Sequence, residues 1–359
     1  MKVLHILGSG TIGGIEKLCL DIGKHSNHHF CYLKRVGSII DEMEKLNIPN
    51  FSVFNSNVKY GMLKILPAYR KIKQYIQNND IKSIVFHTNS LFAWVLIILL
   101  KDSRTKIALY AHSNYDDFIG KSAKKRYLIK IILAKFIFFK IEKMIAISYS
   151  VKNSILSNLK INPDKIKIIY NGIDLSMFKY DDNKNVSNRI NILYVGRLIE
   201  EKGVQNTLEL LSQIKDVEYK FSVIGDGPYK NNLINLSKEL KIDKNVDFLG
   251  ERIDVPLLIK NYDFFIHLPN WEEGFGITVV EAMASGLICI VNSKGAMEEL
   301  VNDNVSGFVL REQNKLMQFT QILKNYSKNR YYDIRVQALE KAKLFSIRNT
   351  VINIEDIFK

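Results

Sequence analysis

The sequence predicts an α/β protein of two doubly wound, Rossmann-like domains, each organised around a parallel sheet. Short apolar runs alternate with helical patterns through both halves of the 359 residues, as expected for parallel strands joined by crossover helices. The first apolar run, 2–7, leads through the glycine-rich GSGTIGG into a helical stretch, which is the usual entry to such a domain. A polar segment, 181–188, interrupts the alternation before it restarts. We therefore place a domain boundary there, with domains 1–180 and 181–345.

The first half is expected to form one complete sheet with helices on both faces. Its apolar runs are short enough for strands, and the longer stretches between them have the periodicity of helices. The predicted strands are 2–7, 30–33, 51–54, 81–86, 106–111, 144–147 and 167–170. The predicted helices are 15–24, 59–77, 92–100, 126–140 and 151–159.

The second half repeats the alternation. Strands are predicted at 190–195, 219–224, 246–249, 263–266, 288–291 and 307–310. Helices are predicted at 204–214, 231–240, 255–261 and 278–284. The tail from Tyr331 has the pattern of two helices.

Composition indicates the cellular setting. The three cysteines are widely separated and fit no metal-ligand spacing, so we expect free thiols in a reducing compartment. The apolar run at the start of MKVLHILGSG is five residues long and is broken by glycine, which is not the pattern of a secretory signal. The longest apolar run, 91–100, is about half the length of a membrane span. We expect a cytoplasmic protein.

The positive charge is concentrated in the first half. The net charge is +14, but residues 1–180 carry 28 Lys and Arg against 12 Asp and Glu, whereas residues 181–359 carry 23 against 25. Basic residues in 59–73 and 121–143 lie among apolar ones, and most of the apolar ones must be core. The cationic excess still favours contact with an anionic membrane surface over a merely soluble basic face. Nucleic acid is disfavoured, because no binding module or aromatic platform is visible.

The stretch 267–287, HLPNWEEGFGITVVEAMASGL, carries the main functional signal. It follows an apolar strand and passes through a glycine bend into a helix, an order that leaves backbone N–H groups and the positive end of a helix dipole available for a phosphate. Glu273 and Glu281 bracket the bend and would more readily hold sugar hydroxyls. The alternative is an ordinary turn, with Glu273 capping the helix and Glu281 on a solvated face.

The whole pattern resembles the signature of the retaining GT-B glycosyltransferases of family 4. The resemblance rests on EGFG with two glutamates separated by seven residues, followed by EAMASG. It implies the GT-B fold, in which two Rossmann-like domains face each other across a cleft, with the acceptor on the first domain and a nucleotide sugar on the second. It also implies that the last helix, about 346–359, joins the first domain. Glu273 would hold the transferred sugar and Glu281 the ribose, with Gly274, Phe275, Gly276, Ile277 and Thr278 also binding the donor.

Two further motifs support a diphosphate site. Arg197 and Lys202 lie in VGRL and EKG, at a strand end and a helix start. Taken alone they would be surface charges, but a guanidinium fork and a lysine can neutralise a diphosphate, and the motifs match the family's diphosphate site. Gly13 and Gly14, in GGIE, resemble the loop that meets the diphosphate from the first domain. Arg252 is a weaker candidate for a contact near the base.

His112 is the histidine candidate for catalysis. It follows the strand 106–111, at the edge where α/β sheets bind ligands, and it resembles the family histidine that contacts the transferred sugar. Its residue type alone favours a structural role. His87, at another strand end, is a weaker candidate for the acceptor side. His5 is expected in the core, and His25, His28 and His29 in a loop.

Catalysis is expected to need neither a metal nor a cofactor. The sequence contains no Asp-x-Asp motif, on which sugar transferases of the other large fold rely to hold a divalent ion. Arg197, Lys202 and helix dipoles would offset the leaving-group charge instead. Retention, by departure and attack on the same face of the sugar, is implied by the resemblance.

These motifs predict a retaining transferase that uses a nucleotide sugar, with a UDP-sugar favoured, and an oligosaccharide or lipid-linked acceptor. A basic protein on the inner face of the membrane suits envelope or capsular polysaccharide assembly. Three alternatives stay open: a catalytically silent membrane-associated scaffold, a nucleotide-sugar epimerase of the same fold, and dinucleotide-dependent redox chemistry. The four charged residues Arg197, Lys202, Glu273 and Glu281 disfavour the scaffold, and the glutamate pair disfavours the epimerase. The missing acid after the second strand disfavours the redox reading.

Overall fold

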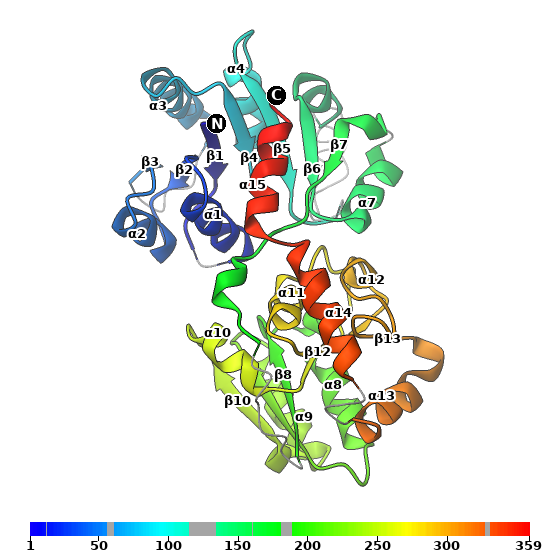
Figure 1. Ribbon diagram of the computed structural model, residues 1–359. Coiled ribbons are helices and arrows are strands. Elements are labelled where there is room, and N and C mark those ends of the chain that lie inside the picture. Colours follow the sequence, from blue (N-terminus) through cyan, green and yellow to red (C-terminus); the bar gives the residue numbers. More distant parts are fainter. Residues whose placement is uncertain (12, 56–60, 115–133, 160, 181–188, 327–330) are drawn as a thin grey trace. The chain divides into compact units, whose positions relative to one another are not determined.

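The computed structural model describes residues 1–11, 13–55, 61–114, 134–159, 161–180, 189–326 and 331–359 (Figure 1). The chain forms two compact units. Unit 1 comprises Met1–Gly172 and Ile347–Lys359, and unit 2 comprises Ile173–Ser346. Each unit is an α/β layer structure around one parallel sheet, as the alternating sequence pattern predicts.

Unit 1 has a seven-stranded sheet in the order β3-β2-β1-β4-β5-β6-β7. All the recorded pairings are parallel, so the carboxyl ends of the strands share one edge. The first strand lies near the middle and is fully buried. The strands are β1 (Val3–Leu7), β2 (His29–Lys34), β3 (Asn50–Phe54), β4 (Ser83–Phe86), β5 (Lys106–Ala111), β6 (Lys143–Ala146) and β7 (Ile166–Ile168).

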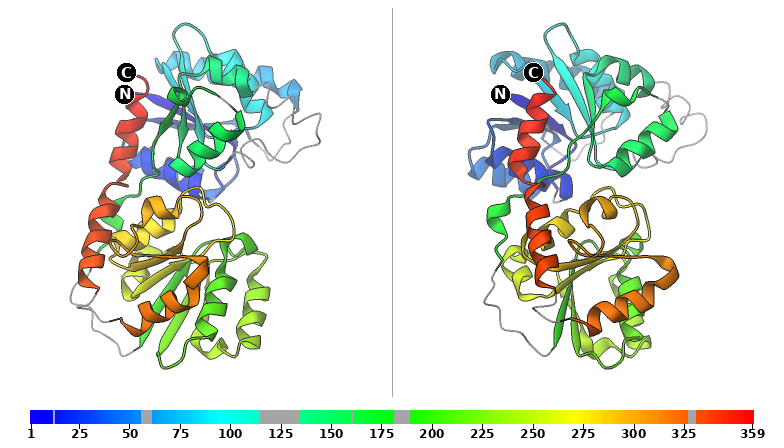
Figure 2. Two further views of the ribbon diagram at one scale, coloured as in Figure 1. Left: turned by 90° about the vertical axis from the view of Figure 1, so that its right-hand side faces the viewer. Right: turned by 45° about the vertical axis from the view of Figure 1, so that its right-hand side comes forward.

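Helices cover this sheet, and one of them comes from the far end of the chain. The helix α15 (Ile347–Asp356) packs beside α1 (Gly14–Lys24) and is the red helix in Figures 1 and 2. Its residue Thr350 donates a hydrogen bond to the carbonyl of Tyr170 at 2.9 Å, and Lys106 donates to the carbonyl of Phe358 at 2.7 Å. The other helices of unit 1 are α2 (Ser38–Lys45), η1 (Met62–Lys64), α3 (Ile65–Asn78), α4 (Leu91–Leu100), α7 (Tyr149–Leu159) and η2 (Pro163–Lys165).

Unit 2 has a six-stranded parallel sheet in the order β10-β9-β8-β11-β12-β13. The strands are β8 (Ile190–Val195), β9 (Tyr219–Ile224), β10 (Val246–Gly250), β11 (Phe264–His267), β12 (Ile288–Asn292) and β13 (Phe308–Leu310). The helices are η3 (Leu175–Met177), η4 (Glu200–Lys202), α8 (Val204–Ser212), α9 (Lys230–Glu239), η5 (Asp243–Asn245), α10 (Val255–Leu258), η6 (Ile259–Asn261), α11 (Ile277–Ala284), α12 (Met297–Leu300), η7 (Glu312–Asn314), α13 (Lys315–Lys324) and α14 (Tyr332–Lys343).

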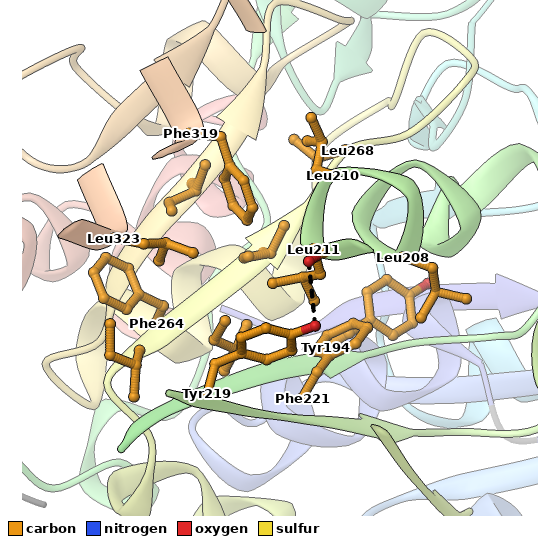
Figure 3. Close-up of a cluster of buried hydrophobic side chains, with 14 of the residues drawn as sticks. Tyr194, Leu208, Leu210, Leu211, Tyr219, Phe221, Phe264, Leu268, Phe319 and Leu323 are labelled. Carbon is orange, nitrogen blue, oxygen red and sulfur yellow. Dashed lines mark hydrogen bonds between the residues drawn. The ribbon is translucent and has the colours of Figure 1, made fainter. Parts of the chain in front are cut away.

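A large apolar core fixes the central strands of unit 2. Tyr194, Phe221 and Phe264 come from three neighbouring strands and are buried among leucines of α8 (Figure 3). The buried hydroxyl of Tyr219 is satisfied by the carbonyl of Leu211, at 3.2 Å. Because these strands are held rigidly, the loops that leave their carboxyl ends start from fixed positions.

Most predicted elements are present, and the largest differences concern the domain boundary and several helices. Unit 2 begins at Ile173 rather than at 181, because Ile173 donates its backbone N–H to the carbonyl of Phe345 and Tyr180 packs beneath Arg335. The helices α2, α12 and α13 were not predicted. The predicted helix 59–77 begins at 62 among the described residues, and of the predicted helix 126–140 only 134–140 lies among them and is helical.

Among the described residues, none of the helices combines the length and the apolar character needed to cross a membrane. The apolar helix α4 is only 10 residues long.

Candidate active site

A buried carboxylate lies at the carboxyl edge of the unit 2 sheet. Glu273 is 8% exposed and its Oε2 accepts three hydrogen bonds. Lys202 Nζ donates at 2.6 Å, His267 Nε2 at 3.2 Å and Trp271 Nε1 at 3.4 Å. All three donors converge on Oε2, whereas Oε1 accepts no recorded hydrogen bond from the described residues. One oxygen is therefore fixed by the protein and the other is available to a ligand.

The surroundings of Glu273 keep it ionised. Burial opposes ionisation, but the hydrogen bond from His267 and the charge of Lys202 outweigh it and hold the pKa of this carboxyl well below its usual range. The Lys202 ammonium also lies over the ring of Trp271, 5.4 Å from its centroid. Two predicted catalytic residues, Lys202 and Glu273, are thus in direct contact.

Glycines bring together the loops that carry this pair. Gly203 follows η4 with a φ of +72°, and a Cβ there would lie 1.9 Å from the carbonyl oxygen of Leu268. Gly295 has a φ of +63°, and a Cβ there would lie 2.1 Å from the carbonyl oxygen of Glu273. Only glycine permits both the left-handed backbone and the close approach. Asn206 also holds α8 to the loop after β11, because its amide donates a hydrogen bond to the carbonyl of Leu268 at 2.8 Å.

Arg197 lies on the same edge but does not join the ion pair. Its side chain is exposed and forms no recorded salt bridge or hydrogen bond with a described residue. It is nevertheless close to the buried Tyr194, whose ring stacks on His267 with centroids 5.9 Å apart. Burial and the charge of Glu273 raise the pKa of Tyr194, while the charge of Arg197 opposes the shift. The charges of Arg197 and Glu273 therefore both influence the pKa of the Tyr194 hydroxyl.

The predicted glycine bend forms the start of α11. Gly276 is the residue before the helix and is left-handed, with φ 95° and ψ 58°. In the first turn of this helix, the N–H groups of Ile277 and Thr278 have no intrahelical partners and point toward the helix N-terminus. Gly274 and these two residues are partly exposed, so an anion could reach this turn.

Two other predicted donor ligands have buried side chains. Phe275 is 3% exposed, and its ring packs edge-on against Phe345 with centroids 5.7 Å apart. Its side chain therefore belongs to the core. Glu281 lies within α11 and is also 3% exposed. Glu281 is therefore buried. The alternative interpretation, an ordinary turn with Glu281 on a solvated face, does not describe its position.

Arg252 is not brought to the Glu273 cluster by any recorded contact. It lies after β10 in an exposed loop and forms a bidentate pair with Asp254, at 2.8 and 2.7 Å. Its guanidinium is engaged locally, two residues along the chain. Its predicted role near a base stays a prediction.

In unit 1, the predicted ligands occupy the carboxyl ends of β1 and β5. Gly13 precedes α1 with an extended backbone, and Gly14 is exposed with open space beside it. His112 follows β5, and its Nε2 lies 2.8 Å from Nδ1 of His87. The structure therefore brings together the two histidines that the sequence placed at separate strand ends.

Sequence reasoning missed several residues that support these groups. His267 ends β11 and fixes Glu273, and a histidine six residues before the glutamate at a strand end was an available signal. Trp271 was not among the predicted site residues, yet it contacts both Lys202 and Glu273. His28 was expected in a loop but is fully buried and hydrogen-bonded, because it comes directly before β2.

The fold and this site define a two-domain Rossmann-like protein of the GT-B class. Over its full length the chain is similar to HepE from Anabaena, solved with UDP and glucose, with 22% identity, a TM-score of 0.82 and 99% of that chain covered. At this identity the likeness concerns the fold.

Sequence comparison identifies the family. Residues 12–177 match Glycosyltransferase Family 4 and residues 177–343 match Glycosyl transferases group 1. The protein belongs to the family 4 glycosyltransferases. An uncharacterized glycosyltransferase of Methanocaldococcus jannaschii is 26% identical over 75% of this chain and 70% of its own length. The UDP-Gal:alpha-D-GlcNAc-diphosphoundecaprenol alpha-1,3-galactosyltransferase of Escherichia coli is 27% identical over 60% of this chain and 57% of its own length.

Proposed function

We propose that this protein is a retaining glycosyltransferase that moves a sugar from a nucleotide sugar to a hydroxyl of a lipid-linked saccharide. The observation that carries the proposal is the enclosed Glu273 carboxylate, which has one oxygen fixed by Lys202, His267 and Trp271 and one left for a ligand. An ionised carboxylate accepts hydrogen bonds from sugar hydroxyls. The adjacent ammonium suits the diphosphate of the same donor.

The leaving group in this proposal is a nucleoside diphosphate. Arg197, Lys202 and the first turn of α11 offset the charge that develops on it. Lys202 has three N–H groups and gives one to Glu273, so the others remain for a phosphate oxygen. Glu281 binds the ribose, and the exposed backbone at Gly14 contacts the diphosphate.

Glu273 and His112 position the transferred sugar. Oε1 of Glu273 accepts from one hydroxyl, and His112 contacts another. Departure and attack then occur on the same face, which retains the configuration; the support for this step is the family resemblance. The reaction needs no resident metal, because protein cations and a helix dipole occupy the role that an Asp-x-Asp-bound ion would have.

The donor we favour is a UDP-sugar, and the acceptor is lipid-linked. The similarity to a structure that holds UDP and to an undecaprenol-dependent galactosyltransferase supports both choices. A lipid-linked acceptor also agrees with the basic first half, which we propose contacts anionic lipid on the inner face of the membrane during envelope or capsular polysaccharide assembly. Lys59 and residues 121–133 of that basic surface lie outside the described residues.

The test is a donor screen with purified protein and EDTA. UDP-, GDP- and ADP-sugars are compared by thermal shift, and nucleotide release is measured with a lipid-diphosphate saccharide acceptor. We expect one donor class to stabilise the protein and to be consumed by the wild type. Glu273→Gln should lose turnover, while Glu209→Gln, a matched change on the exposed face of α8, should keep it.

The alternatives give different outcomes in the same screen. Binding without turnover, in the wild type and with all acceptors, would indicate a silent scaffold. Conversion of the free nucleotide sugar into its epimer without an acceptor would indicate an epimerase. Activity that disappears with EDTA and returns with a divalent ion would refute the metal-independent mechanism.

A further inference from the structure

A hydrogen-bonded chain of four histidines crosses the interior of unit 1. Nε2 of His112 lies 2.8 Å from Nδ1 of His87, and Nε2 of His87 lies 2.8 Å from Nδ1 of His5. Nε2 of His5 lies 2.9 Å from Nδ1 of His28. The chain ends at α15, where Nε2 of His28 lies 3.2 Å from Oε1 of Glu355. Every link joins Nε2 of one ring to Nδ1 of the next, so the chain has a direction.

The rings are packed together in a dry environment. His5 and His28 are fully buried and stacked, with centroids 5.0 Å apart, and His87 is 7% exposed. Burial lowers the pKa of all four histidines, to about 4 for His28 and about 3 for His112. Near neutral pH each ring is therefore uncharged and carries a single N–H.

The carboxylate at the end determines where these protons lie. Ionised Glu355 can only accept a hydrogen bond, so His28 must carry its proton on Nε2. Nδ1 of His28 is then an acceptor, which requires the proton of His5 to be on Nε2. By the same argument His87 carries its proton on Nε2, and so does His112. At the far end His112 keeps a lone pair on Nδ1, a buried atom with no hydrogen-bond partner among the described residues.

We propose that Glu355, acting through His28, His5 and His87, fixes the tautomer of His112, so that Nδ1 of His112 is held as an acceptor for a substrate hydroxyl. Glu355 and the three inner histidines are positioning residues, and only His112 touches the ligand. That the hydroxyl belongs to a sugar rests on the proposed function. The order of the tautomers does not, because it is set in the ligand-free protein.

Neighbouring groups leave this assignment unchanged. The ring of Tyr110 lies against His112, with centroids 4.4 Å apart, but its hydroxyl is directed to the carbonyl of Ile169 and to Oδ1 of Asn171, both at 3.3 Å. The Met1 amino group lies 3.0 Å from Oε1 of Glu355. It adds a positive charge that stabilises the ionised carboxylate.

The same region could be read as a metal site. His5 Nδ1, His87 Nε2 and Cys19 Sγ lie within 4.8 Å of one another. However, the two nitrogens are 2.8 Å apart, whereas nitrogens about 2.0–2.1 Å from a tetrahedral zinc ion would be separated by about 3.3 Å. Burial and the charge of Glu16 raise the pKa of the Cys19 thiol, which opposes the thiolate that a metal needs. The geometry is that of a hydrogen bond.

The test is nitrogen NMR of ¹⁵N-histidine-labelled protein without ligand near neutral pH. Each signal is assigned by single histidine substitutions, and the nitrogen shifts report which ring atom carries the proton. We expect the Nε2–H tautomer for His112, His87, His5 and His28. His25 provides the internal reference, because its Nδ1 lies 2.9 Å from the carbonyl oxygen of Asp21 and must be protonated to donate. An Nδ1–H tautomer of His112 in the wild type, or a mixture, overturns the proposal.

Two substitutions at the far end test the transmission. Glu355→Gln retains an amide oxygen that can accept from His28, so the tautomers should persist. Glu355→Lys provides only donors, so His28 must accept at Nε2, and the chain should reverse to place a proton on Nδ1 of His112. Asp356→Lys is the matched control, with the same charge change on the next residue, which contacts Lys359 instead, and the tautomers should stay as in wild type.

Kinetics separate this inference from the proposed function. If the donor screen succeeds, Glu355→Lys should raise KM for the donor about tenfold, since one hydrogen bond is lost. Glu355→Gln should keep the KM of the wild type. An unchanged His112 tautomer in Glu355→Lys overturns the inference while the transferase function stands. Failure of all donors to bind, with the tautomers as expected, rejects the sugar ligand only. One equivalent of zinc that binds and replaces the His5–His87 hydrogen bond also overturns the proposal.

Discussion

Nζ of Lys202 lies 2.6 Å from Oε2 of Glu273, with 20% of the lysine side chain and 10% of the glutamate side chain exposed. The lysine predicted to bind a diphosphate is therefore balanced by the predicted sugar ligand in the ligand-free protein. Arg197 has no recorded ion pair among the described residues. A bound diphosphate would contact Lys202 while that lysine still pairs with Glu273. Arg197 would be available to it as a second cation.

The Lys202–Glu273 pair should contribute to stability. Lys202→Met leaves the buried carboxylate without its cation, so we expect the free energy of unfolding to fall by about 3 kcal/mol. Glu273→Gln in the same chain removes the stranded charge and should recover much of the loss. Urea denaturation of both single variants and the double variant measures this coupling. Additive effects in the double variant would show that the two side chains do not interact energetically.

Arg197→Gln should weaken nucleotide binding more than it alters the fold. Loss of one charge-assisted contact to a phosphate is expected to raise Kd for a nucleoside diphosphate by about tenfold to a hundredfold. Calorimetric titration of the ligand measures it, with thermal unfolding as the check on the fold. Lys244→Gln, an exposed cation at the amino end of β10, is the control. Equal Kd values in the two variants would remove Arg197 from the site.

Gly295→Ala should displace the Glu273 loop. The added Cβ would lie 2.1 Å from the Glu273 carbonyl oxygen and 2.4 Å from its nitrogen, at a φ of +63°. Gly250→Ala is matched in backbone strain, with a φ of +70°, but its Cβ meets nothing within 4 Å. We expect Gly250→Ala to lower the free energy of unfolding by about 1 kcal/mol. Gly295→Ala should lower it by at least twice as much, and only this variant should lose turnover. Thermal unfolding and turnover of the two variants measure the difference, and similar values would show that strain, not contact, sets the cost.

The fold could be predicted from sequence because strand and helix periods alternate clearly. The strands 106–111, 190–195 and 219–224 agree with β5, β8 and β9 at both ends. The short helix α12 was missed because four residues carry too little periodicity to be recognised. The helix α2 was missed for a similar reason, since only Ile39, Ile40 and Met43 of its eight residues are buried.

The site was predictable only where a motif carried it. Lys202 and Glu273 are 71 residues apart, and the glycine and charge motifs anticipated that both serve one ligand. Their direct ion pair was not anticipated, because it depends on how two loops meet at Gly203 and Gly295. The histidine chain left no sequence signal, since its members come from β1, the turn before β2, two other strand ends and α15.

Stability should fall steeply on mild acidification. Burial lowers the pKa of His5, His28, His87 and His112 in the folded protein, so below about pH 6.5 the unfolded chain binds more protons than the folded one. The free energy of unfolding then decreases as pH falls, by about 1.4 kcal/mol per pH unit for each such histidine. Urea denaturation from about pH 6.5 to about pH 4.5, above most carboxyl titration, measures the slope. His28→Gln should reduce the slope by about one proton, and an unchanged slope would contradict the assignment.

Membrane contact should depend on two exposed leucines, one in the first turn of the basic helix α3 and one just before it. Leu63 is 96% exposed and Leu66 50% exposed, and Lys64 lies between them. Insertion of a leucine side chain into the interface contributes about 1.5–3 kcal/mol, so Leu63→Ser with Leu66→Ser should weaken binding to vesicles of anionic phospholipid by more than about tenfold. Ile253→Ser with Leu257→Ser is the matched control, because these side chains are 100% and 69% exposed in unit 2 and lie outside the basic half. Vesicle sedimentation measures both, and equal binding to neutral and anionic vesicles, or equal losses in the two variants, would reject a lipid surface on unit 1.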